Sequence, residues 1–107
     1  MNAQLKQEVR DCTLDFVTAV RMTLRYEDEQ LARLTALLTG LAEALRDQTM
    51  IDKDLAADLY ELPKTVRNMF LSYDGPAESR PEIFDRLEDA WVDLDALVMD
   101  CLQPADA

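Results

Sequence analysis

The amino-acid sequence predicts an all-α fold, most simply an antiparallel bundle of about four helices that forms a single domain over residues 1–107. Only two glycines and four prolines interrupt a chain rich in Leu, Ala, Asp, Glu and Arg, which is typical of helices rather than of short strands joined by turns. Apolar residues recur every three or four positions along four segments. Short connections between such segments favour antiparallel neighbours. A hydrophobic content of 49% is sufficient for one core.

The first two segments carry the clearest apolar stripes. The first predicts a helix of about twenty residues from Leu5 to near Tyr26. The acidic run Glu27–Glu29 then predicts the start of a second helix, because carboxylates in a first turn oppose the positive end of the helix dipole. The first stripe consists of Leu5, Val9, Cys12, Phe16, either Ala19 or Val20, and either Thr23 or Leu24. The second consists of Leu31, Leu34, Leu38, Leu41 and Leu45.

The third predicted helix contains a proline. We expect it to begin between Thr49 and Asp52, where Thr49-x-x-Asp52 resembles a capping box with Asp in place of Glu. Proline has no amide proton and disfavours helical geometry at the preceding residue, so Pro63 predicts either a kink or a split into two short helices. The stripe that continues across the proline favours the kink; it consists of Leu55, Leu59, Leu62, Val66 and either Met69 or Phe70.

A loop and a last helix complete the chain. Tyr73-Asp74-Gly75-Pro76 has the composition of a loop, and Ser79-x-x-Glu82 with Pro81 in the first turn is a helix-start signal. The helix should end before Pro104. Its predicted inward positions are Phe84, Leu87, Trp91, Leu94, Val98 and either Cys101 or Leu102.

The two cysteines are far apart in the sequence and show no metal or redox spacing. Cys12 and Cys101 each fall on an apolar helix face, which predicts two buried thiols. A disulfide between the first and last helices is the alternative, and the absence of a secretion signal argues against it.

Catalytic chemistry is sparse, so we expect no enzyme, no cofactor and no metal. The chain has no histidine and cannot form a Ser-His or Cys-His nucleophile. Neither a phosphate loop nor a dinucleotide-binding turn is present. The remaining enzymatic hypothesis is an all-α, Mg²⁺-dependent nucleotide hydrolase that uses carboxylates. Its candidate sets are Glu8, Asp11 and Asp15; Asp54, Asp58 and Glu61; and Asp85, Glu88, Asp89 and Asp93, but solvated polar faces explain these sets better.

Negative charge is concentrated in the last third of the chain. Residues 1–67 carry 12 acidic and 9 basic side chains, whereas residues 68–107 carry 10 and 2. Asp85, Asp89 and Asp93 recur at i+4 and should form an acidic ridge on the last helix. Arg86 is the one base close enough in sequence to relieve the repulsion between them. The predicted partner-binding residues are Glu82, Asp85, Glu88, Asp89 and Asp93, with Tyr60, Tyr73 and Asp74 as anchors.

Two hypotheses of function follow. The first is a small acidic inhibitor that blocks a basic partner such as a toxin or a nucleic-acid-binding protein, as an immunity protein, an antitoxin or a phage-type anti-defence protein does. The second is an adaptor or secretion chaperone with an apolar groove. Exposure of Leu14, Val17, Leu37, Leu71 and Val92 as one patch would favour the groove or a homodimer. We expect a cytoplasmic protein with no membrane contact and no direct nucleic-acid binding, because clustered Lys and Arg are lacking. The ridge would also be explained by solubility alone.

Overall fold

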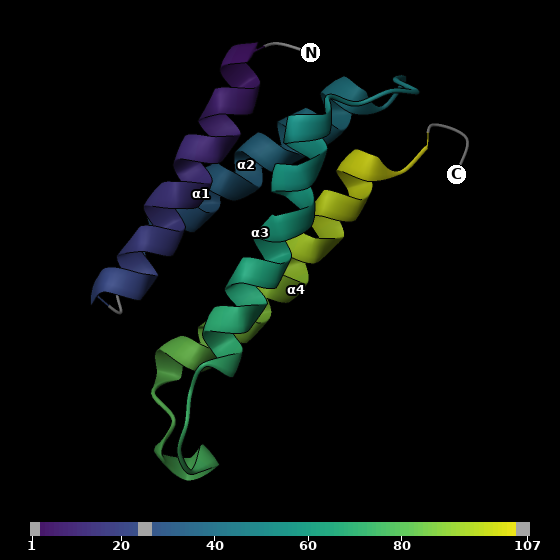
Figure 1. Ribbon diagram of the computed structural model, residues 1–107. Helices are drawn as coiled ribbons and strands as arrows, with labels where there is room; N and C mark the ends of the chain where they lie inside the picture. Colours follow the sequence, from purple (N-terminus) through teal and green to yellow (C-terminus); the bar gives the residue numbers. More distant parts are fainter. Residues whose placement is uncertain (1–2, 24–26, 105–107) are drawn as a thin grey trace.

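The computed structural model describes residues 3–23 and 27–104, which form four α-helices (Figure 1). The helices are α1 (Ala3–Thr23), α2 (Asp28–Leu45), α3 (Lys53–Leu71) and α4 (Glu82–Leu102), and a short 3-10 helix, η1 (Ala77–Ser79), precedes α4. The described ranges contain no strand. The all-helical prediction is therefore confirmed.

Each helix packs against two others. The most extensive contact joins α3 to α4; α4 also packs against α2, and α1 packs against α2 and α3. In the part of the chain that the structure describes, α1 does not pack on α4, nor α2 on α3. These two pairs therefore lie on the diagonals of the bundle. In Figure 1, α1 and α3 run in the same direction and α4 runs in the opposite one.

The diagonal placement of α2 and α3 differs from the expectation that short connections join packed neighbours. Residues 46–52 link the two helices. When extended they reach at most about 25 Å, whereas the diagonal of a bundle with neighbours about 9 Å apart is about 13 Å. A connection of this length can therefore cross the end of the bundle.

The periodic apolar residues form the core. The buried hydrophobic residues come from all four helices and include nearly every predicted stripe position, such as Phe16, Leu38, Leu59 and Leu94. Leu5, Leu31 and Phe84, at the beginnings of their stripes, are only partly buried and pack against this core. Trp91, in the middle of the α4 stripe, is also only partly buried. Because one face of each helix is fixed inward, the periodicity also determines which side chains face outward.

The helix boundaries agree with the predictions except at two caps. The predicted end near Tyr26 lies outside the described residues, and α2 begins as predicted with Asp28 and Glu29 in its first turn. The N-cap of α3 is Asp52, not Thr49, and the Asp52 carboxylate accepts a hydrogen bond from the Leu55 amide at 3.0 Å.

The start of α4 is the second corrected cap. Ser79 ends η1 instead of capping α4, and Pro81 flanks the helix in an extended conformation. The physical reason is the residue before Pro81: Arg80 has an extended ψ of 125°, as steric contact with a following proline ring requires, so the helix cannot begin earlier.

Pro63 does not split the third helix, because α3 continues from Lys53 to Leu71 with the proline inside it. Pro63 is buried, and its ring contributes to the apolar side of α3. None of the helices described here is long and apolar enough to cross a membrane.

Candidate functional site

The outward side of α4 is strongly acidic. This helix carries seven acidic residues and one basic residue. Burial of Leu87, Leu94 and Val98 fixes the opposite side of the helix against the core. We call the exposed carboxylates predicted from the sequence the acidic face; they are Glu82, Asp85, Glu88, Asp89 and Asp93. Asp100 is also exposed and lies seven residues beyond Asp93, so it extends the acidic face by two turns. The sequence prediction did not include Asp100, although its seven-residue spacing from Asp93 indicates the same side of the helix.

Most carboxylates of the acidic face have no cationic partner among the residues that the structure describes. Asp85 pairs with Arg80, with 2.6 Å between the guanidinium and the carboxylate. Within the described ranges, Glu82, Glu88, Asp89 and Asp93 form no ion pair. Their charge is therefore directed to solvent or to a partner.

Arg86 does not have the role that its sequence position indicated. Its guanidinium pairs with Asp28 in the first turn of α2, and so joins α4 to α2. The residue that relieves the ridge is Arg80, five positions before Asp85, which the extended segment ahead of α4 brings to the carboxylate. The prediction for Arg86 was wrong because it was based on spacing along α4 alone, which does not reveal a partner on another helix such as Asp28.

Tyr73 is held within the connection between α3 and α4. Its hydroxyl donates a hydrogen bond to the Pro76 carbonyl at 2.9 Å, and its ring lies 5.2 Å from the ring of Phe84. A Cβ at Gly75 would lie 2.8 Å from the Tyr73 hydroxyl oxygen, so a side chain there would displace the end of the Tyr73 ring. Tyr73 is half-buried, whereas its neighbour Asp74 is exposed.

Tyr60 lies apart from the other predicted anchors. It is thirteen residues before Tyr73 on the α3 side, which corresponds to about 20 Å along a helix. Tyr60 is 58% exposed, so it is accessible to a partner. The predicted residues therefore occupy two places: Tyr73, Asp74, Glu82 and Asp85 at the loop end of α4, and Tyr60 near the middle of α3.

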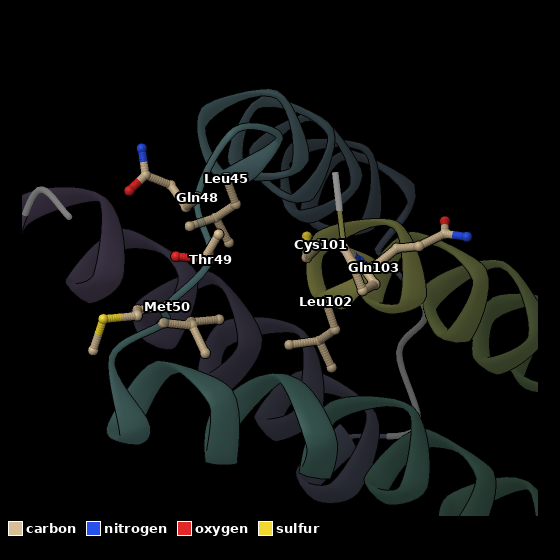
Figure 2. A pocket seen from close by; sticks show the side chains of 9 residues that line it. Leu45, Gln48, Thr49, Met50, Cys101, Leu102 and Gln103 are labelled. Carbon is tan, nitrogen blue, oxygen red and sulfur yellow. The ribbon is translucent and has the colours of Figure 1, made fainter. Parts of the chain in front are cut away.

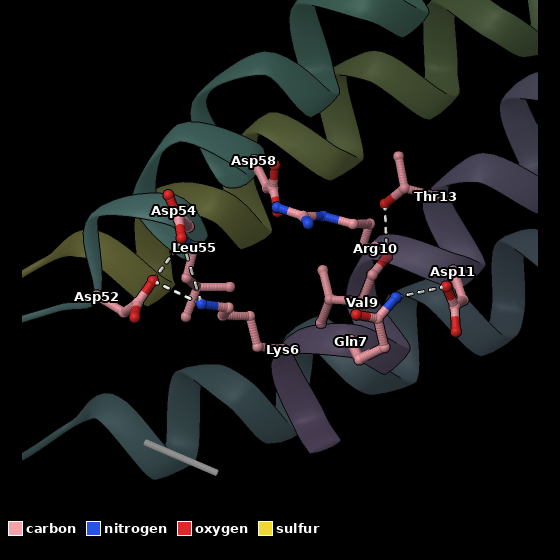
Figure 3. Close-up of polar contacts among 10 residues, drawn as sticks. All are labelled: Lys6, Gln7, Val9, Arg10, Asp11, Thr13, Asp52, Asp54, Leu55 and Asp58. Atoms are coloured by element: carbon pink, nitrogen blue, oxygen red, sulfur yellow. Dashed lines mark hydrogen bonds and ion pairs between the residues drawn. The ribbon is translucent and has the colours of Figure 1, made fainter. Parts of the chain in front are cut away.

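Two of the three α3 carboxylates considered for a metal site, Asp54 and Asp58, form ion pairs with α1 (Figure 3). Lys6 Nζ lies 3.2 Å from Asp52 and 3.6 Å from Asp54, and Arg10 lies 2.9 Å from Asp58. Among the residues that the structure describes, no three His, Cys, Asp or Glu side chains are close enough to hold a metal ion.

These contacts also shift two pKa values. The Leu55 amide and then the Lys6 ammonium hold the pKa of Asp52 below its usual value. Hydrogen bonding to Asp52 raises the pKa of Lys6, and desolvation opposes this shift. The pair fixes the beginning of α3 against α1.

Both cysteines are buried free thiols, as predicted for their positions on apolar faces, with exposed fractions of 3% for Cys12 and 5% for Cys101. The Cys101 thiol donates a hydrogen bond to the Leu38 carbonyl at 3.4 Å. Burial raises the pKa of Cys101 to about 11, with a smaller contribution from Asp100. Burial also raises the pKa of Cys12, and the charge of Arg33 partly opposes this effect.

A cavity of about 240 Å³ lies beside Cys101 at the end of the bundle where the connection between α2 and α3 meets the end of α4 (Figure 2). Leu45 and Leu102 approach it from α2 and α4, and Met50 approaches from the connection. None of the predicted partner-binding residues lines this cavity. Since a thiol with a raised pKa is a poor nucleophile at neutral pH, the cavity offers little reactive chemistry.

No protein family matches the sequence, and neither the curated proteins nor the solved structures contain a match.

Proposed function

We propose that this protein is a small acidic inhibitor that binds a basic protein through the acidic face of α4 and thereby blocks it. The supporting observation is the set of four exposed carboxylates, Glu82, Glu88, Asp89 and Asp93, that no described cation neutralises. The partner class is a toxin or a nucleic-acid-binding protein, since both present clustered Lys and Arg. Immunity proteins, antitoxins and phage-type anti-defence proteins act in this way.

Electrostatics gives the acidic face its role in binding. A field of one sign attracts a partner of the opposite sign over roughly a Debye length, about 8 Å at physiological salt, and orients it before contact. Such steering raises association rates from about 10⁵–10⁶ M⁻¹s⁻¹ to as much as 10⁸–10⁹ M⁻¹s⁻¹. Asp74 and Asp100 enlarge the field at the two ends of α4. The role is one of binding and not of catalysis, and we place it in the cytoplasm.

The proposal includes two finer features of the fold. We propose that the bundle is antiparallel in the sense that each successive helix reverses direction. We also propose that α3 bends at Pro63, because the Leu59 carbonyl loses its i+4 amide donor at the proline. Such a bend would leave the acidic face unchanged, since Pro63 lies on α3.

The adaptor or secretion chaperone is the second candidate. Among the residues expected to test it, Leu14, Leu71 and Val92 are exposed, Val17 is buried and Leu37 is half-buried. Leu14 belongs to α1 and Val92 to α4, and these helices do not pack against each other. The five residues therefore do not form one patch, and the acidic inhibitor remains the better supported function.

Affinity capture with charge-matched variants tests the proposal. Three proteins are immobilised: the wild type, the acidic-face variant Asp85→Asn/Asp89→Asn/Asp93→Asn, and a control variant Asp15→Asn/Asp47→Asn/Glu61→Gln. The control removes the same number of charges from exposed positions on α1, on α3 and just after α2. Lysate of the source cells is applied at low salt, and retained proteins are eluted with high salt.

The expected result is one basic protein that the wild type and the control retain and the acidic-face variant loses. Its association rate with the wild type should fall as salt rises, and this salt dependence should be weaker for the acidic-face variant. Its own activity should decrease when the wild type is added. Equal capture by both triple variants, or no basic protein in the eluate, would contradict the proposal.

A further inference from the structure

An apolar groove with rims of opposite charge lies between α3 and α4. The groove encloses about 440 Å³. Tyr60 and Met99 line it with exposed fractions of 58% and 55%, and Trp91 forms part of its wall. Burying such side chains is favourable by about 25 cal/mol per Å² of apolar surface. The groove is therefore a surface from which a partner would gain binding free energy.

The α3 rim of the groove is cationic. Lys64 Nζ lies 3.6 Å from the centre of the Tyr60 ring, and Arg67 Cζ lies 5.6 Å from the centre of the Trp91 ring. These distances are within the range of cation–π attraction, which holds both cations beside the groove. Neither Lys64 nor Arg67 forms an ion pair inside the described ranges.

The α4 rim is anionic. Asp95 lines the groove, and Glu88, two turns earlier, lies on the same side of α4 by its seven-residue spacing. Neither carboxylate forms an ion pair with a described residue, so the two rims of one molecule do not neutralise each other. Each rim retains a charge for a partner of opposite sign.

We propose that the groove binds a second copy of this chain and forms a homodimer with two-fold symmetry. A wholly basic surface would meet Lys64 and Arg67 with like charge, and a wholly acidic surface would meet Glu88 and Asp95 with like charge. An isologous interface is self-complementary: a two-fold axis parallel to the groove places the α3 rim of one copy against the α4 rim of the other. The cations and carboxylates are then paired twice, around an apolar centre formed by Tyr60 and Met99 from both copies.

This inference goes beyond the proposed function and does not depend on it. On a helical wheel of α4, Asp89 and Asp93 lie about 120° and 160° from Asp95 and so remain outside the dimer interface. Glu88 lies about 20° from Asp95 and belongs to both surfaces. The two interactions also respond differently to salt. Binding of a basic partner weakens as salt rises. In the dimer, salt screens both the attraction between the rims and the repulsion between two chains that each have a net charge of −11, so its salt dependence should be weaker.

Charge reversal on one rim at a time tests the dimer. Variant one is Lys64→Glu/Arg67→Glu, which makes both rims acidic. Variant two is Glu88→Lys/Asp95→Lys, which makes both rims basic. A control variant, Asp15→Lys/Asp47→Lys, changes the net charge as much as variant two but away from the groove. Mass is measured by light scattering after size exclusion, over a series of concentrations and at low and high salt, and circular dichroism verifies that each variant is folded.

The proposal requires that the wild type and the control dimerise and that each rim variant alone is a monomer. An equimolar mixture of the two rim variants should dimerise again, because an acidic rim then faces a basic rim at both positions across the axis. The emission of Trp91, the single tryptophan, should change with the same concentration dependence. A monomeric wild type at every concentration and salt, a dimer that persists in either rim variant, or a mixture that stays monomeric would each overturn it. These outcomes leave the capture of a basic partner unaffected.

Discussion

Replacing Asp89 with Asn should stabilise the fold, although it removes a charge of the acidic face. Asp89 has like-charged residues at both i−4 and i+4, Asp85 and Asp93. Each such pair destabilises a helix by about 0.2–0.5 kcal/mol, so the substitution should raise the free energy of unfolding by about 0.4–1 kcal/mol. Asp and Asn have similar helix propensities, so propensity adds little. The lower part of this range is expected, because Arg80 already offsets part of the charge of Asp85.

Urea unfolding followed by far-ultraviolet circular dichroism measures this effect. For an m-value of about 1.5 kcal/mol/M, the midpoint should rise by about 0.3–0.7 M with no change in m. In 1 M salt the difference should shrink, since the Debye length of about 3 Å is then shorter than the 5–6 Å between residues one turn apart.

Glu61→Gln is the control for this substitution. Glu61 is an exposed residue of α3 whose neighbours three residues away are Asp58 and Lys64, of opposite sign, so its removal should change stability little. If Asp89→Asn is no more stable than the wild type at low salt, repulsion along α4 is negligible. The acidic face would then carry no cost in stability, and that part of the reasoning would be refuted.

Three further substitutions or measurements test other parts of the molecule. Pro63→Ala should raise the melting temperature by several degrees. The substitution gains about 3 kcal/mol of helix propensity and loses roughly 1.6 kcal/mol with the burial of two ring carbons. A lower melting temperature would show that the packing of the ring dominates. Asp52→Ala should destabilise the protein at pH 7. Because folding lowers the pKa of Asp52, the ionised carboxylate adds to the free energy of unfolding above the unfolded pKa of about 3.9. This contribution disappears as the pH falls through the lower pKa of the folded protein. Urea titrations at pH 7 and pH 3 should therefore show a smaller difference from the wild type at pH 3. Cys101, with its pKa of about 11, should react with a thiol reagent at pH 8 far more slowly in the native protein than in urea, and rapid native labelling would contradict its burial.

The sequence was most informative where one helix determines the outcome alone. The spacing of Leu34, Leu38, Leu41 and Leu45 predicted the buried face of α2, and all four are buried. The same logic placed Asp85, Asp89 and Asp93 on the outside of α4, and all three are exposed. Periodicity is sufficient in these cases because a helix with one apolar stripe has only one way to bury it.

Interactions between elements were not predictable in the same way. Arg86 was assigned to the ridge on its own helix, but it faces α2 and pairs with Asp28. Helix pairing was also missed, because connection length only limits how far apart α2 and α3 can lie and does not select their neighbours. Two caps were misassigned for a local reason: at α3 two polar residues three positions apart compete for the N-cap, and at α4 the proline prevents the earlier start.

The groove escaped prediction because its two walls come from different helices. Tyr60, Lys64 and Arg67 are spaced by four and three residues and form a visible stripe, but its significance depends on which helix lies beside it. Once α3 is placed against α4, the same residues stand opposite Asp95 and Met99. The acidic face and the groove then share α4 and meet at Glu88, while Asp89 and Asp93 face away from the groove. A helix with this division of charge can hold a second copy along one edge and leave the other exposed, so dimerisation would present two acidic faces to a basic partner. Two linked faces raise avidity without any new contact, provided that the partner can reach both.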